Sequence, residues 1–281
     1  MSTNDHDPMG SAQQFLTDLS SSEIYREIFP GSAVVLGGSY STGRADTYSD
    51  VDLFLFVDDE RFPEAQQRAI ARGLARTGGD WSARRVTSCE IFVKVRSYEE
   101  LCEELDGDLA VAYRIYSRAQ IWADPSGKFS AAMAKYAERF ASEVPALVRQ
   151  TSLALRRCIK FGRDSHLRGN AVAFDLLRHD YLTALLQMFF LLEGEPFPYS
   201  KWLHPVAMDE TEAGRAIGDL VESISGTGDR AEHLKAMRSA YLYIKSEAAR
   251  RNLDDPGMIS PEVDGTTRFF EEEILSEIAK L

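Results

Sequence analysis

Two aspartates separated by one residue open the apolar stretch "DVDLFLFV", and the glycine-rich turn "GGSYSTG" precedes them. Residues two apart on a strand point to the same side, so Asp50 and Asp52 are predicted to present both carboxylates together. Two unit charges about 4 Å apart repel by about 4 kcal/mol at an effective dielectric of roughly 20. The pair must therefore be protonated, neutralised or bridged by a cation. Carboxylate oxygens favour Mg²⁺, which keeps positions open for water and substrate phosphates.

The preceding turn has the residue types that a phosphate-binding turn needs. Gly38 and Gly43 allow close backbone approach, and Ser39 stands where a helical turn would begin, with a hydroxyl and amide N–H groups to offer a phosphate. The glycine spacing matches a P-loop, but Arg44 and the alanine after it replace the lysine and hydroxyl residue that a P-loop requires. Arg44 is itself a candidate phosphate ligand, and a solvent-exposed arginine is the alternative.

A third acidic residue interrupts the alternating stretch "VTSCEIFVKV". The alternation places Ile91 and Val93 on an apolar face, and Glu90 and Lys94 on the opposite face. An exposed strand residue is the structural alternative for Glu90. Lys94 is expected to be a surface residue rather than a phosphate contact.

The secondary structure that positions these residues is predicted to differ between the two parts of the chain. The pattern of the first part predicts helices and short strands in turn, and the pattern from about residue 129 is long and helical. We therefore predict an α+β protein with a mixed sheet and flanking helices in residues 1–128, and a helical bundle in residues 129–281. The expected helices are 12–29, 63–77, 98–105, part of 109–117, 138–161, 170–193, 210–225, 229–252 and one from Thr267, and the expected strands are 32–38, 50–57, 86–95 and 119–123.

Composition narrows the class of protein. The chain has 281 residues and a formal net charge of -12, which argues against nucleic acid as the main partner, because nucleic-acid binders usually present a basic face. Three cysteines without CxxC spacing argue against a disulfide framework or a zinc site. No signal peptide or membrane helix is evident, so we expect a cytoplasmic protein without a membrane partner.

The stretch "GGSYSTGRADTYSDVDLFLF" resembles the signature of the nucleotidyltransferase superfamily related to DNA polymerase β. More narrowly, its Gly-Ser-Tyr-x-x-Gly start and Tyr-Ser-Asp lead into the strand resemble antibiotic nucleotidyltransferases that modify lincosamides and aminoglycosides. The resemblance implies that Asp50 and Asp52 hold the metal and that Gly38 and Ser39 bind the β and γ phosphates. It implies that Glu90 completes the carboxylate cluster, shares a second metal ion and acts as the base on the acceptor hydroxyl.

The resemblance extends less sharply into the helical half. In "LLEGEPFPYSKW", Lys201 follows a turn near the place where related enzymes keep a lysine for the nucleotide phosphates. A solvated lysine at a helix end is the alternative. Asp175, Arg178 and Asp180 lie along one predicted helix, and whether they line a cleft is left open.

The resemblance implies a Mg²⁺-dependent enzyme, with two metal ions, that transfers AMP from ATP, or a nucleotide from another triphosphate, to a hydroxyl of a small molecule. An aminoglycoside or lincosamide acceptor would make it an antibiotic-resistance enzyme, and a homodimer is compatible with this family. Two alternatives stay open: transfer of AMP to a protein, as in toxin–antitoxin systems, and a nucleotide-binding module without catalysis.

Overall fold

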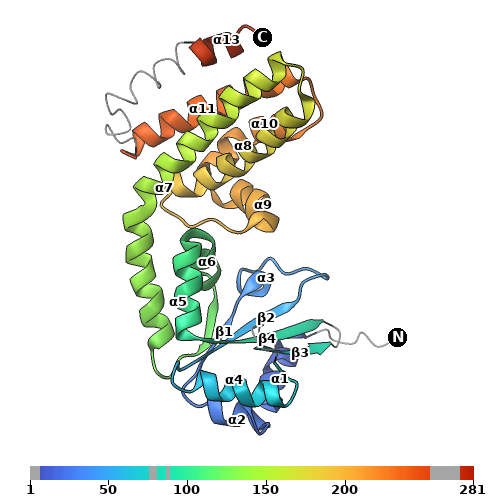
Figure 1. Cartoon of the computed structure of the whole chain (residues 1–281), viewed down its shortest axis with the longest axis vertical. Coiled ribbons are helices and arrows are strands. Elements are labelled where there is room, and N and C mark those ends of the chain that lie inside the picture. The colour runs from blue at the N-terminus through green and yellow to red at the C-terminus, as the bar shows by residue number, and fades with distance from the viewer. Residues whose placement is uncertain (1–6, 76–80, 87–88, 254–272) are drawn as a thin grey trace. The chain divides into compact units, whose positions relative to one another are not determined.

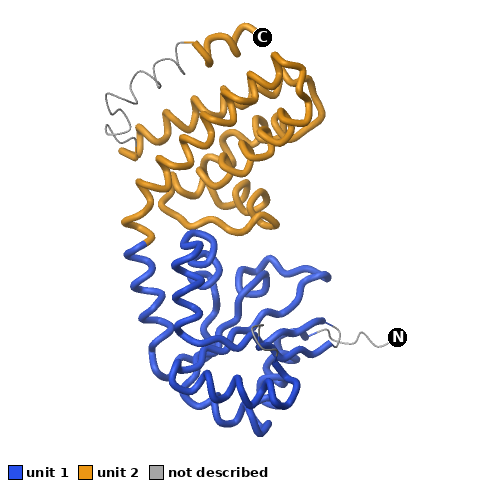
Figure 2. Tube along the Cα trace, in the orientation of Figure 1, with its two compact units in different colours: residues 1–139 blue, residues 140–281 orange. Residues whose placement is uncertain are grey.

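The computed structural model describes residues 7–75, 81–86, 89–253 and 273–281. The chain divides into two compact units, residues 1–139 and residues 140–281 (Figure 2). The first unit holds a sheet with helices, and the described residues of the second unit are helical (Figure 1). The predicted α+β class is therefore confirmed. Helix α7, Lys128–Leu167, runs through the boundary between the two units.

The strands that the structure describes in the first unit form one mixed sheet in the order β3-β4-β2-β1-β5. Strands β2 and β4 are parallel, and the other neighbouring pairs are antiparallel. The two strands that carry the predicted acidic residues are therefore neighbours that start at the same end of the sheet. The strands are β1 (Ala33–Leu36), β2 (Val51–Val57), β3 (Trp81–Val86), β4 (Glu90–Ser97) and β5 (Gln120–Ala123).

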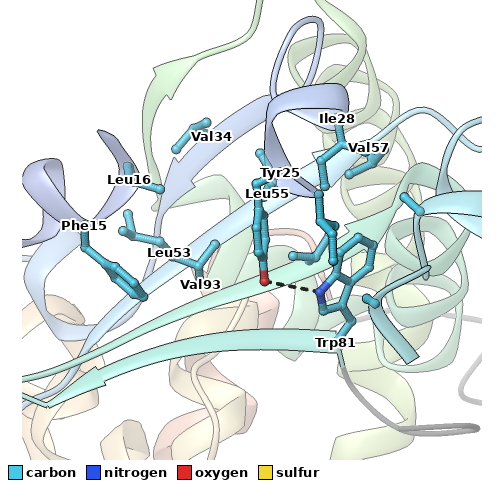
Figure 3. Close-up of a cluster of buried hydrophobic side chains, with 14 of the residues drawn as sticks. Phe15, Leu16, Tyr25, Ile28, Val34, Leu53, Leu55, Val57, Trp81 and Val93 are labelled. Atoms are coloured by element: carbon cyan, nitrogen blue, oxygen red, sulfur yellow. Dashed lines mark hydrogen bonds between the residues drawn. The ribbon is translucent and has the colours of Figure 1, made fainter. Parts of the chain in front are cut away.

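One face of this sheet packs on the main hydrophobic core of the unit. Helices α1 (Pro8–Ser21), α2 (Tyr25–Ile28) and α4 (Phe62–Ala71) contribute side chains to this core, together with alternate residues of β2 and β4. Figure 3 shows the cluster, in which the Trp81 indole N–H donates a hydrogen bond of 3.2 Å to the Tyr25 hydroxyl. Burying the apolar face forces the intervening residues of both strands onto the other face.

Aromatic side chains cover part of that other face. Helices α5 (Tyr98–Gly107) and α6 (Leu109–Ser117) follow β4 along the chain. Aromatic rings of β2 pack there against rings of α6 and α7. The Phe54 and Tyr116 ring centroids lie 5.3 Å apart, and those of Phe56 and Phe129 lie 5.2 Å apart. The face is therefore closed over the later residues of β2.

The second unit is built from helices that the sequence largely predicts. Helix α10 packs against α8 and α11, and α9 packs against α8 and α10. Arg156 of α7 donates a hydrogen bond of 2.7 Å to the Tyr241 hydroxyl of α11. Besides α7, the helices described in this unit are α8 (Ala171–Leu192), α9 (Ser200–Glu210), α10 (Glu212–Ser225), α11 (Arg230–Arg250) and α13 (Leu275–Ile278).

Several predicted boundaries were wrong. The helix predicted for 12–29 is two helices, α1 and α2, because Ser22 ends the first in an extended conformation. The strand predicted for 86–95 overlaps the last residue of β3 and most of β4, and residues 87–88 of that prediction lie outside the described residues. Strand β3 itself was not predicted, because its two arginines and its serine interrupt the apolar residues. Helix α9 was also missed, since Pro205 lies inside it. The predicted start of the last helix, Thr267, lies outside the described residues.

Candidate active site

The parallel register of β2 and β4 brings the acidic residues to one face of the sheet. Val51 pairs with Ile91 and Asp52 pairs with Phe92, so extending the register by one residue places Asp50 beside Glu90. Val51 and Ile91 are fully buried in the core. Because side chains alternate along a strand, Asp50, Asp52 and Glu90 belong to the opposite face. The sequence predicted this face for Glu90 and a shared side for Asp50 and Asp52.

The covered part of this face ends next to the acidic residues. Phe54 and Phe56 are buried, whereas Asp50 and Asp52 are only partly buried. The Asp52 side chain keeps 21% of its surface exposed, and the Glu90 side chain keeps 33%. A polar ligand can therefore reach the carboxylates while aromatic packing holds the strands beneath them in place.

The glycine turn lies against the second aspartate. The Gly37 N–H donates a hydrogen bond of 2.8 Å to the Asp52 carbonyl, and the short helix α3, Gly38–Ser41, follows. Gly38 has φ +67°, and a Cβ at this position would lie 2.9 Å from Asp52 Oδ2. Only glycine fits both the backbone angle and the close approach. The turn predicted to hold phosphates is thus in van der Waals range of a carboxylate predicted to hold metal.

Two cationic side chains pair with the carboxylates. Lys94 Nζ donates a hydrogen bond of 2.9 Å to Asp52 Oδ1, and Arg84 of β3 forms an ion pair with Glu90. The Arg84 contact lacks the angles of a hydrogen bond. Lys94 is partly exposed, and its pairing with Asp52 was not predicted. Lys94 lies four residues after Glu90, and this spacing predicted that both side chains lie on the same face of the strand. The contact of Lys94 with Asp52 depends on the pairing of β4 with β2.

The carboxylates do not form a ready metal cage. Among the described residues, no group of three His, Cys, Asp or Glu side chains is arranged to hold a metal ion. Magnesium, however, is usually bound through one or two carboxylates together with substrate phosphates. Asp52 already accepts one cation, the Lys94 ammonium. The oxygen donors of Asp50 and Asp52 therefore fit Mg²⁺ arriving with a nucleotide.

Two neutral groups flank the acidic residues. Burial raises the pKa of the Cys89 thiol, which precedes Glu90, so this cysteine stays protonated at neutral pH. Burial also raises the pKa of the Tyr40 phenol in α3, with smaller contributions from Cys89 and Asp46. A protonated thiol is a poor metal ligand and nucleophile. The chemistry available at this face therefore comes from the carboxylates and their cationic partners.

Two of the remaining predicted residues belong to the glycine turn or follow it directly, and one is a lysine of the second unit. Arg44 is partly buried in the loop after α3, where its N–H donates a hydrogen bond of 2.9 Å to the Ser39 carbonyl. Ser39 itself is buried. Lys201 is an exposed residue of α9 in the second unit, with Nζ 5.3 Å from the centroid of the Trp202 ring. Its role toward a nucleotide remains a prediction.

The residues of α8 that the sequence left open take part in packing of the second unit. Arg178 Nη1 donates hydrogen bonds of 3.1 and 2.9 Å to the carbonyls of Ile224 and Gly226, at the end of α10. Its Nη2 also lies 3.5 Å from Asp175 Oδ1. A cation at a helix C-terminus satisfies carbonyls that the helix leaves unpaired. Arg178 thus stabilises this helix end, and Asp180 is exposed on the same helix.

One comparison with known proteins covers the region of this site. The model of the nucleotidyltransferase domain family matches residues 21–135. A crystal structure of a nucleotidyltransferase-like protein from Exiguobacterium sibiricum 255-15 is similar over 85% of this chain and 76% of that chain, with 11% sequence identity and a TM-score of 0.46. A likeness this distant says nothing about activity. No curated protein matches the sequence.

The matched region contains the whole sheet, the Gly38 turn and all three carboxylates. No helix among the described residues has the length and apolar character needed to cross a membrane. The match over residues 21–135 thus supports nucleotidyl transfer as the activity of this region of the chain.

Proposed function

We propose that this chain is a magnesium-dependent enzyme that transfers AMP from ATP to a hydroxyl of a small molecule and releases pyrophosphate. The observation that carries the proposal is the parallel register of β2 and β4, which puts Asp50, Asp52 and Glu90 on one sheet face beside the Gly38 turn. Nucleotidyl transfer needs negative phosphates to be held near a proton acceptor. Carboxylates, a glycine turn and neighbouring cations meet that need.

The reaction is an in-line displacement. The acceptor oxygen attacks the α-phosphorus, the bond from that phosphorus to the bridging oxygen breaks, and pyrophosphate leaves with the bonding electrons. Glu90 takes the proton of the attacking hydroxyl, and the turn at Gly38 and Ser39 holds the β and γ phosphates. When bound by Asp50 and Asp52, Mg²⁺ supplies charge neutralisation for the phosphates. Positioning and charge carry most of the rate in phosphoryl transfers of this kind.

The proposed acceptor is an aminoglycoside or lincosamide, which rests on the sequence resemblance of "GGSYSTGRADTYSD" to antibiotic nucleotidyltransferases. In this proposal residues 1–128 are catalytic, and residues 129–281 bind the acceptor and contribute Lys201 to the nucleotide phosphates. A nucleoside triphosphate and a small molecule are the proposed partners, with a homodimer as the proposed assembly.

The test is pyrophosphate release from ATP and Mg²⁺ with a panel of aminoglycosides and lincosamides. Asp52→Asn is expected to abolish release while leaving the fold intact. Asp58→Asn is a matched control, because Asp58 follows the other end of β2 and pairs with Lys128. Turnover that survives in Asp52→Asn, or that is lost equally in Asp58→Asn, would contradict the site assignment.

The same assay separates the alternatives. With ATP labelled in the α-phosphate, transfer to a lysate protein instead of a small molecule would favour protein AMP transfer. Binding of ATP without release of pyrophosphate in any mixture would favour a non-catalytic module.

A further inference from the structure

We infer that Lys94 has two successive partners: it neutralises Asp52 before substrate binds, and it binds the nucleotide phosphates once Mg²⁺ takes its place on that carboxylate. The inference rests on the proposed function and assigns a substrate-binding residue that the sequence did not predict.

The first step is the position of the ammonium. Lys94 Nζ lies 2.9 Å from Asp52 Oδ1, while the other oxygen, Oδ2, faces the turn at Gly38. Asp52 is therefore held between a cation and the turn predicted to hold phosphates. A phosphate in that turn would lie beside both Asp52 and the end of the lysine side chain.

The second step is the low free energy of the ion pair between Lys94 and Asp52. The Lys94 side chain is 35% exposed, and its ammonium lies 5.3 Å from the centroid of the Phe54 ring. The lysine stem thus lies along the border between the aromatic cluster and the open part of the face. A partly exposed ion pair is worth only about 0.2–1 kcal/mol. Binding of a divalent cation to Asp52 can therefore displace the ammonium at small cost.

The third step is charge. A triphosphate placed beside Asp50, Asp52 and Glu90 meets strong repulsion, and Arg84 is already paired with Glu90. An ammonium released from Asp52 stays on the same face, because β4 anchors it through the buried residues Val93 and Val95. Its flexible stem carries a point charge that suits a phosphate oxygen. Lys94 thus changes from a partner of Asp52 to a partner of the nucleotide.

Two binding measurements on the full chain test this. Lys94→Gln is expected to tighten Mn²⁺ binding to the nucleotide-free protein about fivefold, because the metal no longer displaces an ion pair. The same variant is expected to weaken binding of α,β-methylene-ATP at saturating Mg²⁺ by about fivefold or more, because Lys94 is then free to bind the phosphates. A lysine that merely supports the strands would not move these two affinities in opposite directions.

Controls keep the outcomes distinct. Lys128→Gln removes a comparable lysine–aspartate pair at the other end of β2 and should change neither affinity. Lys94→Arg keeps the positive charge and should retain nucleotide binding at saturating Mg²⁺ within about threefold. The inference is overturned if Lys94→Gln leaves Mn²⁺ affinity unchanged or lowered, or leaves nucleotide affinity at saturating Mg²⁺ intact. If the wild-type protein binds neither Mn²⁺ nor nucleotide, both the proposed function and the role of Lys94 fail. If Asp52→Asn weakens Mn²⁺ binding but Lys94→Gln has no effect, only the role of Lys94 fails.

Discussion

Two glycines of the turn have the same backbone conformation but different surroundings, so they separate a folding effect from a catalytic one. Gly38 has φ +67° and Gly43 has φ +70°. An alanine in this left-handed region costs about 1–2 kcal/mol, so both Gly38→Ala and Gly43→Ala should lower the free energy of unfolding by about that amount. A Cβ at Gly38 would lie 2.9 Å from Asp52 Oδ2, whereas a Cβ at Gly43 would meet nothing within 4 Å.

The difference should appear in activity. Relief of the contact at Gly38 requires the Asp52 carboxylate or the turn to shift, and misplacement of reacting groups by about 1 Å lowers rates by about a hundredfold. Gly38→Ala should therefore lose about that factor in pyrophosphate release, while Gly43→Ala stays within a few fold of wild type. Urea unfolding of both variants supplies the stability comparison. Equal activity in the two variants, whether both retained or both lost, would refute this account of the turn.

Three further predictions concern other parts of the chain. Glu90→Gln should lower turnover by about 10²- to 10⁴-fold while leaving nucleotide affinity in an equilibrium titration unchanged; unaltered turnover would remove its role as base. Hydrogen bonds from Tyr136 and, to a smaller extent, from Arg139 lower the pKa of the Asp106 carboxyl from its ordinary value. The ionised Asp106 therefore stabilises the fold at neutral pH, and this contribution is lost as the pH falls through the lowered pKa. Asp106→Asn should accordingly be less stable than wild type at pH 7, with a difference that shrinks as the pH falls below the ordinary range of an aspartate carboxyl in urea titrations; a constant difference would contradict the shift. Arg178→Ala should lower stability by about 0.5–1.5 kcal/mol, because it removes the hydrogen bonds to the two carbonyls at the end of α10; turnover per folded molecule below the melting temperature should stay unchanged, and a loss there would instead give Arg178 a role in substrate binding.

Much of the fold could be predicted from local patterns. Alternation in "DVDLFLFV" and "EIFVKV" identified β2 and β4 and the correct outward residues, because burial of one sheet face imposes a period of two on the strand. Long apolar periodicity likewise located α8, α10 and α11 to within a few residues. Strand β3 was not predicted because an edge strand has fewer buried positions, and only Trp81 of its six residues is buried.

The candidate site could be predicted from the sequence less completely than the fold. Spacing and residue type indicated Asp50, Asp52, Glu90 and the glycine turn, because each belongs to a short stretch whose chemistry is visible in the sequence. The partners of these residues come from other strands. Arg84 lies on β3 and Lys94 lies diagonally from Asp52 on β4, so neither ion pair follows from spacing along the chain.

The amino-acid sequence by itself determined which side chains of β4 lie on which face, and that Asp50 and Asp52 share a side, since alternation is a local property of extended backbone. Only the tertiary structure decided which strands are neighbours, in what direction and in what register. That pairing placed a lysine ammonium on Asp52, brought Asp52 against Gly38, and closed the rest of the face with aromatic rings. These are contacts between segments far apart in the chain, and they depend on the order of strands rather than on any single stretch.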